Sequence, residues 1–338
     1  MPADRRMRPT MMDVASHAGV SQATVSLVLN GSPGAKLSDA TRQRVRAAAD
    51  ELGYRLPRRS NRPAPGNPSV IGFVADELSS DPWMGMAFDG ARRKALEFGM
   101  GIFLAVSNGD SDNEGAILEH LQSLPLLGLI YGTVLTRRVS PNRGFYDHNT
   151  VLLNCYDVPR RLHSIIPGDV LGGRLATQRL IDAGHRRIGF INGQQGVDAA
   201  RDRLKGYRQA LSSNDIAYDP ALVKSGNWET SRGYDLTREL LSLDPRPDAI
   251  FCGNDLMAVG CIDALHEARL SIPEDVAVIG FDDRECAKHT HPPLTTLLLP
   301  HYGMGEIAAE NLIEMAGGHN TSPVQLKIEC PLVERGSV

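Results

Sequence analysis

The sequence of 338 residues has no long hydrophobic run. A membrane-spanning helix needs roughly 18 or more consecutive apolar residues, and no segment approaches that length. The N-terminal segment, MPADRRMRPT, also lacks the apolar stretch of a secretory signal. We therefore expect a protein of the cytoplasm with no membrane partner.

Cysteine is scarce and follows no pattern. The five cysteines are odd in number and include no C-x-x-C pair, which argues against a disulfide framework and against a zinc site. We expect buried or free thiols, no bound metal and no cofactor. The five are Cys155, Cys252, Cys261, Cys286 and Cys330.

Motifs that accompany enzymes on α/β folds are also missing. The sequence has no G-x-G-x-x-G after its first apolar run, no phosphate loop and no G-x-S-x-G elbow. The adjacent carboxylates Asp282 and Asp283 could suggest acid–base chemistry, but no substrate-activating group accompanies them in the sequence. We therefore do not expect an enzyme.

Charge is unevenly distributed. Residues 1–62 hold eleven Lys or Arg and five Asp or Glu, a net charge of +6, so the rest of the chain, whose total is −4, carries −10. A basic head on an acidic body concentrates attraction for a polyanion such as DNA at the N-terminus.

Within that head, the segment Asp13 to Asn30 predicts two short helices joined by a tight turn. Gly19 allows the left-handed conformation of the turn, and Ser21 can cap the second helix. Polar side chains on the second helix are candidates to face outward into a DNA groove. A third helix is expected from the N-cap Ser38 to Leu52, with Tyr54 beneath the small core. The outward-facing candidates are Gln22, Thr24 and Ser26.

Beyond the head, residues 55–69 contain four prolines and no hydrophobic periodicity, which indicates a linker. Short apolar runs then alternate with amphipathic segments. This alternation predicts parallel sheets with helices on both faces, because parallel strands need crossover connections. The expected strands are 70–75, 102–106, 126–131, 151–154, 164–166, 188–192, 249–252 and 276–281, and the expected helices include 85–98, 172–183, 200–212, 232–243 and 255–268.

Several specific motifs occur in a characteristic order: T-x-x-DVA-x-x-AGVS-x-ATVS-x-VLN at 10–30, GHRRIGFING at 184–193, FCGNDLMAVG at 251–260, IPEDVAVIGFDD at 272–283 and PPLTTL at 292–297. From residue 10 to about residue 335 the chain resembles the lactose-repressor (LacI/GalR) family of bacterial transcription regulators.

The resemblance implies a small all-α helix-turn-helix head followed by an α/β core of two doubly wound subdomains, like that of periplasmic sugar-binding proteins. The head would span residues 1–57, the Pro-rich hinge 58–69 and the effector-binding core 70–338. Within the core, the first subdomain would comprise about 70–161 plus 293–322, and the second about 162–292 plus 323–338.

For DNA, the resemblance implies base recognition by the start of the second helix. Gln22 could pair with adenine, and Ala23 could contact a thymine methyl group. The other candidate DNA contacts in the head are better suited to phosphates or helix ends than to reading bases. They are Thr10, Ser21, Thr24, Ser26 and Asn30.

Two positions depart from the family pattern. Leu27 stands where relatives commonly carry an arginine, and Pro63 stands where a leucine of a short hinge helix wedges into the minor groove. Because the hinge prolines disfavour a helix, we expect the nearby arginines to make extended contacts instead. They are Arg58, Arg59 and Arg62.

For the effector, the resemblance assigns contacts to five residues. Arg203 would grip a sugar hydroxyl or a carboxylate, Asp282 would accept hydrogen bonds from sugar hydroxyls, and Asn254 would supply an amide. The chain's two tryptophans, Trp83 and Trp228, would form aromatic walls. A mono- or disaccharide or a polyol is favoured, although Arg203 alone would also tolerate a sugar acid or phosphate.

Alternative assignments remain open at two positions. Arg201 could be the ligand arginine in place of Arg203, or only a surface charge. Asp283, next to Asp282, could simply cap a helix or turn.

The expected function is that of a homodimeric repressor of carbohydrate-metabolism or uptake genes. It would bind a near-palindromic double-stranded operator and respond to a small sugar-like effector. The alternative is a solute-binding protein of transport or chemotaxis with the same core. The basic helical head and the missing signal segment speak against it.

Overall fold

The computed structural model describes residues 9–29, 38–54, 69–79, 81–318 and 322–338. Contacts divide the chain into two compact units. Unit 1 comprises Met1–Val134, Ser140–Ile165 and His301–Gln325, and unit 2 comprises Leu135–Val139, Ile166–Pro300 and Leu326–Val338.

The N-terminal part of unit 1 is a cluster of three helices: α1 (Met11–Ala18), α2 (Gln22–Leu29) and α3 (Asp39–Leu52). Gly19 ends α1 in the left-handed region with φ 63°, as the predicted tight turn requires. Ser38 caps α3, and Tyr54 is buried against the three helices. Their shared core contains Met11, Val14, Ala15, Ala18, Val25, Val28, Val45, Ala48 and Ala49.

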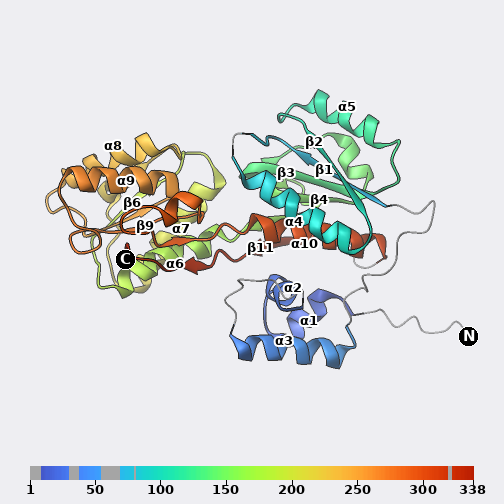
Figure 1. The fold of residues 1–338 in the computed structure, drawn as a ribbon, viewed down its shortest axis with the longest axis horizontal. Coiled ribbons are helices and arrows are strands. Elements are labelled where there is room, and N and C mark those ends of the chain that lie inside the picture. Colours follow the sequence, from blue (N-terminus) through green and yellow to red (C-terminus); the bar gives the residue numbers. More distant parts are fainter. Residues whose placement is uncertain (1–8, 30–37, 55–68, 80, 319–321) are drawn as a thin grey trace, which may run out of the picture. The chain divides into compact units, whose positions relative to one another are not determined.

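A mostly parallel six-stranded sheet follows, with the order β11-β5-β4-β3-β1-β2 (Figure 1). Its strands are β1 (Val70–Ala75), β2 (Gly101–Val106), β3 (Leu126–Val139), β4 (Thr150–Asp157), β5 (His163–Pro167) and β11 (Gln325–Ile328). The helices α4 (Trp83–Glu97) and α10 (His301–Ala316) pack side by side on one face, and α5 (Ser111–Leu121) lies on the other.

Unit 2 contains a parallel four-stranded sheet with the order β7-β6-β8-β9. The strands are β6 (Ile188–Asn192), β7 (Val223–Ser225), β8 (Ala249–Cys252) and β9 (Ala277–Ile279). The helices pack in two pairs (Figure 1): α6 (Asp169–Asp182) with α7 (Asp198–Ser213), and α8 (Thr230–Leu241) with α9 (Asp255–Glu267).

Smaller elements complete the described part of the chain. Three 3-10 helices, η1 (Arg143–Asp147), η2 (Pro220–Leu222) and η3 (Glu285–Lys288), lie in connections, and β10 (Thr296–Leu297) pairs antiparallel with β12 (Leu332–Val333). The predicted fold class, a helical head followed by doubly wound α/β units, is confirmed.

Two predictions from composition also have a structural outcome. All five cysteines are free thiols, and only Cys286 is partly exposed. In the described ranges, no helix has both the length and the apolar character needed to cross a bilayer.

Candidate functional site

The centre of the candidate effector site is Arg203, which lies on α7 in unit 2. Its Nε donates a 2.8 Å hydrogen bond to Oδ1 of Asp169, and Nη1 donates to the carbonyl oxygen of Gly253. The guanidinium carbon lies 3.6 Å from the centroid of the Phe281 ring. Since the side chain is 5% exposed, these contacts hold the guanidinium in one orientation.

Asp282 faces the same guanidinium. Its Oδ1 lies 4.0 Å from Nη1 of Arg203, and its Oδ2 accepts a 3.1 Å hydrogen bond from Nε of Arg284. The backbone of Asp282 has φ 119°, which is unusual for a residue with a side chain. Strained backbone of this kind is enriched at ligand-binding positions.

Trp228 and Asn254 adjoin this cluster. The guanidinium of Arg203 is 5.6 Å from the centroid of the Trp228 ring, and Nδ2 of Asn254 donates to the carbonyl oxygen of Trp228 at 2.9 Å. Asn254 also caps α9 by accepting from the Met257 amide. Trp228 has φ 74°, and its buried indole Nε1 has no hydrogen-bond partner among the residues that the structure describes. Because a buried donor usually has a partner, this N–H is available to a ligand.

A glycine makes room for the indole. A Cβ placed on Gly193 would overlap the six-membered ring of Trp228, so only glycine fits beneath it in this arrangement. Gly193 closes the GHRRIGFING motif and follows β6 directly, so the motif contributes the surface against which the Trp228 ring packs.

Four of the five predicted effector residues are thus brought together in unit 2. The fifth, Trp83, begins α4 in unit 1. Its ring is buried and stacks on His301, with ring centroids 5.3 Å apart and an angle of 21° between the planes.

Sequence reasoning missed Asp169, which accepts a hydrogen bond from Nε of Arg203 at 2.8 Å. Burial raises the pKa of Asp169, and the Arg203 charge opposes that rise. The two residues are 34 positions apart. No local motif marks Asp169, and only the packing of α6 on α7 reveals its role.

Asp255, Arg284 and Phe281 were also not singled out. Asp255 accepts hydrogen bonds from Oγ1 of Thr296 at 2.6 Å and from the Arg284 amide at 2.7 Å. Burial and then the nearby Asp282 charge raise the pKa of Asp255 well above its ordinary value. Asp255 follows Asn254 in the FCGNDLMAVG motif and begins α9, so that motif was the available signal.

Arg201 and Asp283, the two positions with alternative assignments, both form ion pairs. Arg201 is 59% exposed and pairs with Asp198 and Asp202 at 2.6 and 2.8 Å, which makes it a surface charge. Asp283 forms a 2.5 Å ion pair with Arg335. It therefore anchors the C-terminal segment.

In the helical head, Thr10 and Ser21 are helix caps. Thr10 forms a capping box with Asp13, and Oγ of Ser21 accepts from the Thr24 amide at 3.1 Å. Gln22 is half-buried at the first position of α2, and positions 23 and 26 lie within the same helix. The candidates Asn30, Arg58, Arg59 and Arg62, and the predicted non-helical hinge, lie outside the described residues.

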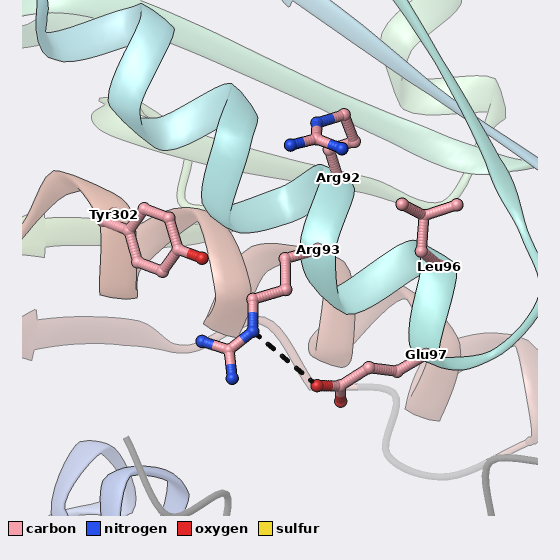
Figure 2. A pocket seen from close by; sticks show the side chains of 5 residues that line it. All are labelled: Arg92, Arg93, Leu96, Glu97 and Tyr302. Carbon is pink, nitrogen blue, oxygen red and sulfur yellow. Dashed lines mark ion pairs between the residues drawn. The ribbon is translucent and has the colours of Figure 1, made fainter. Parts of the chain in front are cut away.

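A groove of about 460 Å³ on unit 1 contains none of the predicted residues (Figure 2). It runs along α4 and α10 and is lined by Arg92, Arg93, Leu96, Glu97 and Tyr302. Arg93 forms ion pairs with Glu97 at 3.9 Å and with Glu306 at 3.3 Å. The charge of Arg93 is thus already balanced.

Two families of known proteins match separate parts of the chain. Residues 10–56 match the family described as bacterial regulatory proteins, lacI family, and residues 177–338 match a periplasmic binding protein-like domain.

Similar proteins match nearly the whole length. The HTH-type transcriptional regulator CelR of Thermobifida fusca is 36% identical, with 99% of each chain covered. The Ribose operon repressor of Escherichia coli (strain K12) is also 36% identical, with 97% of this chain and 99% of the relative covered.

Two solved structures share the fold. A CelR–cellobiose complex has a TM-score of 0.68 at 33% identity, covering 98% of this chain and 100% of that chain. The lac repressor dimer bound to operator and the anti-inducer ONPF has a TM-score of 0.69 at 26% identity, covering 98% and 99%.

Proposed function

The chain belongs to the lacI family of bacterial regulatory proteins and is a DNA-binding transcriptional regulator, and from this premise we propose that it is a repressor controlled by an uncharged carbohydrate. The observation that carries the proposal is the cluster of Arg203, Asp282 and Trp228 in unit 2. It combines an oriented cation, a buried carboxylate and an indole with an unpartnered N–H.

The charges of this cluster favour hydroxyl groups over an anion. Arg203 is already paired with Asp169, and Arg284 with Asp282. An incoming carboxylate or phosphate would meet two buried carboxylates and would have to compete with them for the guanidinium groups. A hydroxyl can accept from one group and donate to the other without bringing a charge into the buried site.

Aromatic and amide groups support the same ligand class. An indole face packs well on the apolar face of a sugar ring, and its edge N–H can donate to a hydroxyl. The solved structure of CelR with cellobiose has the same fold, and this similarity supports a carbohydrate as the effector of this chain. Direct contact of the ligand with Trp83, Arg203, Trp228, Asn254 and Asp282 is part of the proposal.

DNA binding follows from the helical head. The lac repressor is a dimer in its operator complex, and we extend that arrangement to this chain as a homodimer on a near-palindromic site. Two-fold symmetry of the protein then matches two half-sites. Base contacts by Gln22 and Ala23 and backbone contacts by the basic linker belong to the same proposal.

The proposed organisation is a head at 1–57, a hinge at 58–69 and a two-part core at 70–338. The family consists of DNA-binding regulators, and we propose that this member works in the cytoplasm by binding alone, without catalysis. A solute-binding protein would share the core, but its function does not require a DNA-binding head. The match of residues 10–56 to the lacI family therefore favours the regulator.

A thermal-shift screen tests the effector assignment. Neutral mono- and disaccharides, their acids and phosphates, purines and organic acids are added to the purified full-length protein. We expect one neutral carbohydrate to raise the melting temperature, because a ligand that binds only the folded state stabilises it.

Two variants locate the site. Trp228→Phe keeps the aromatic face but removes the N–H, and Asp282→Asn keeps the shape but removes the charge. Both variants should reduce the carbohydrate-dependent rise in melting temperature. Trp83→Phe tests separately, by the same measurement, whether Trp83 of unit 1 contributes to binding. If a purine or an organic acid stabilises the protein and no carbohydrate does, the assignment is wrong.

A further inference from the structure

We propose that unit 2 carries a second, anion-binding site on the outer face of α7, which takes a small molecule bearing a phosphate group. The site is a surface groove of about 680 Å³, a volume within the usual range for small-molecule sites. It is lined by Arg174, Arg201, Leu204, Lys205, Arg208, Gln209, Ser212 and Ser213.

The groove follows from the spacing of charges along α7. Arg201, Lys205 and Arg208 are separated by four and three residues, so they form one stripe on the helix. Arg203 lies on the opposite, buried side of the same helix. One face of α7 therefore serves the effector cluster, and the other presents cations to solvent.

Two glycines bring a further cation to this stripe. A Cβ on Gly206 of α7 would overlap the backbone of α6 at Val170, and a Cβ on Gly173 of α6 would overlap the carbonyl oxygen of Arg203. Glycine at both positions lets the two helices pack backbone to backbone. Arg174 of α6 follows Gly173 directly, and it lines the groove with the α7 cations.

The cations of the groove are of two kinds. Arg201 is oriented by its ion pairs with Asp198 and Asp202. The guanidinium carbon of Arg208 lies 4.3 Å from the centroid of the Tyr218 ring, and its Nη2 donates to the Tyr218 hydroxyl at 2.8 Å. Arg174 and Lys205 are exposed and have no side-chain hydrogen bond or ion pair with any described residue. Two pre-oriented guanidinium groups thus accompany two cations that are available for a ligand.

Like charges at these spacings repel one another and lower helix stability. Among the described residues, no Asp or Glu lines the groove itself, although Asp198 and Asp202 pair with Arg201 and balance its charge. The remaining cations, Arg174, Lys205 and Arg208, have no carboxylate among the groove-lining residues, although residues 63–338 carry a net charge of −10. An anion placed in the groove would relieve that repulsion. Forked guanidinium groups match phosphate oxygens, and Ser212, Ser213 and Gln209 offer neutral donors at the same site.

The inference is independent of the proposed effector. The buried Arg203 is already paired with carboxylates, whereas the cations of the groove face solvent. The two sites should therefore take different ligands, a neutral carbohydrate and a phosphate. Failure of one assignment leaves the other untouched.

Isothermal titration calorimetry on the full-length protein tests the proposal, with sodium pyrophosphate and glycerol 3-phosphate as probes and glycerol as the neutral control. Ionic strength is held constant, because surface charges are screened by salt. The double variant Arg174→Gln/Lys205→Gln removes the two unpaired cations. The matched control, Arg232→Gln/Arg269→Gln, removes two other cations of unit 2 that do not line the groove.

We expect one saturable phosphate site per chain in the wild type and in the control, and binding weaker by about tenfold or more in the double variant. If phosphate bound only to the basic head, its affinity would be the same in the double variant as in the wild type. That outcome contradicts the proposal. Absence of saturable binding in the wild type also contradicts it.

Non-specific DNA is the competing occupant. Its affinity is measured for the same variants. If the double variant loses affinity for DNA but not for pyrophosphate, the groove belongs to the DNA-binding surface and the phosphate-site proposal is wrong.

Discussion

Nε of Arg203 donates to Oδ1 of Asp169 across 2.8 Å, and the two side chains are only 5% and 2% exposed. A buried ion pair of this kind orients the guanidinium, but it also leaves a costly unpaired charge when one partner is removed. The pair therefore links the stability of unit 2 to the chemistry of the candidate effector site.

The first prediction concerns this pair. Asp169→Ala should lower the free energy of unfolding by about 3 kcal/mol, because it leaves Arg203 buried without its hydrogen-bonded partner. The pair of Arg179 and Glu334 gives a control with an exposed carboxylate, since Glu334 is 56% exposed. Glu334→Ala should cost about 1 kcal/mol or less. Equal losses in chemical denaturation would contradict the structural role given to Asp169.

A second prediction concerns the glycine beneath Trp228. Gly193→Ala should displace the indole and destabilise the protein by about 1–3 kcal/mol, as overpacking does. It should also reduce stabilisation by a bound carbohydrate. Gly303→Ala on α10 is the control, because nothing lies within 4 Å of its added Cβ. Thermal unfolding with and without carbohydrate measures both effects, and a wild-type response in Gly193→Ala would refute the packing argument.

The head yields a third prediction. Gln22→Ala should relax the preference for one base pair in each half-site by about 1–3 kcal/mol, while the salt dependence of binding stays the same. The target site is selected from random duplexes, and affinities are measured by fluorescence anisotropy. Ser21→Ala is the comparison, because it removes the cap of α2. It should weaken binding to all sequences alike, and an altered base preference in Ser21→Ala but not in Gln22→Ala would reverse the assignment.

The buried Asp255 predicts a dependence of stability on pH. Burial and the Asp282 charge raise the pKa of Asp255 above its ordinary value of 3.8. Between the unfolded and folded pKa values the folded state holds the extra proton, so the free energy of unfolding falls as the pH rises through that window.

Asp255→Asn cannot ionise, so its stability should fall less steeply with rising pH than that of the wild type. Chemical denaturation at several pH values above 4 measures the two slopes. Slopes are compared because the asparagine also changes hydrogen bonding to Thr296 and Arg284 at every pH. Asp263→Asn, at an exposed position of α9, is the control. Identical slopes in the wild type and Asp255→Asn would exclude this carboxyl as the source.

Much of the fold could be predicted from the sequence, because the patterns that indicate its strands and helices are local. β6 and β8 are short apolar runs buried on both faces, and the predicted ranges 188–192 and 249–252 coincide with the observed strands. The helices α5 and α10 were not singled out. α10 is buried over most of its circumference and therefore lacks the amphipathic stripe that marks a surface helix.

The sequence predicted the candidate site only in part, because local signals mark some of its residues and not others. Two of the quoted motifs contain Asn254 and Asp282, and the family resemblance marked Arg203 and Trp228. Asp169 and Phe281 acquire their roles through contacts between distant segments, which no local spacing encodes. The contacts predicted for Asn30, Arg58, Arg59 and Arg62 stay predictions.

We expect carbohydrate binding in the core to change the affinity of the head for its operator. The most direct measurement is the operator dissociation constant of the full-length protein with and without the carbohydrate that stabilises it. We predict a change of about 5- to 150-fold, the usual range of allosteric coupling, that is lost in Trp228→Phe. An operator affinity that saturating carbohydrate leaves unaltered, or an equal change in that variant, would contradict the account.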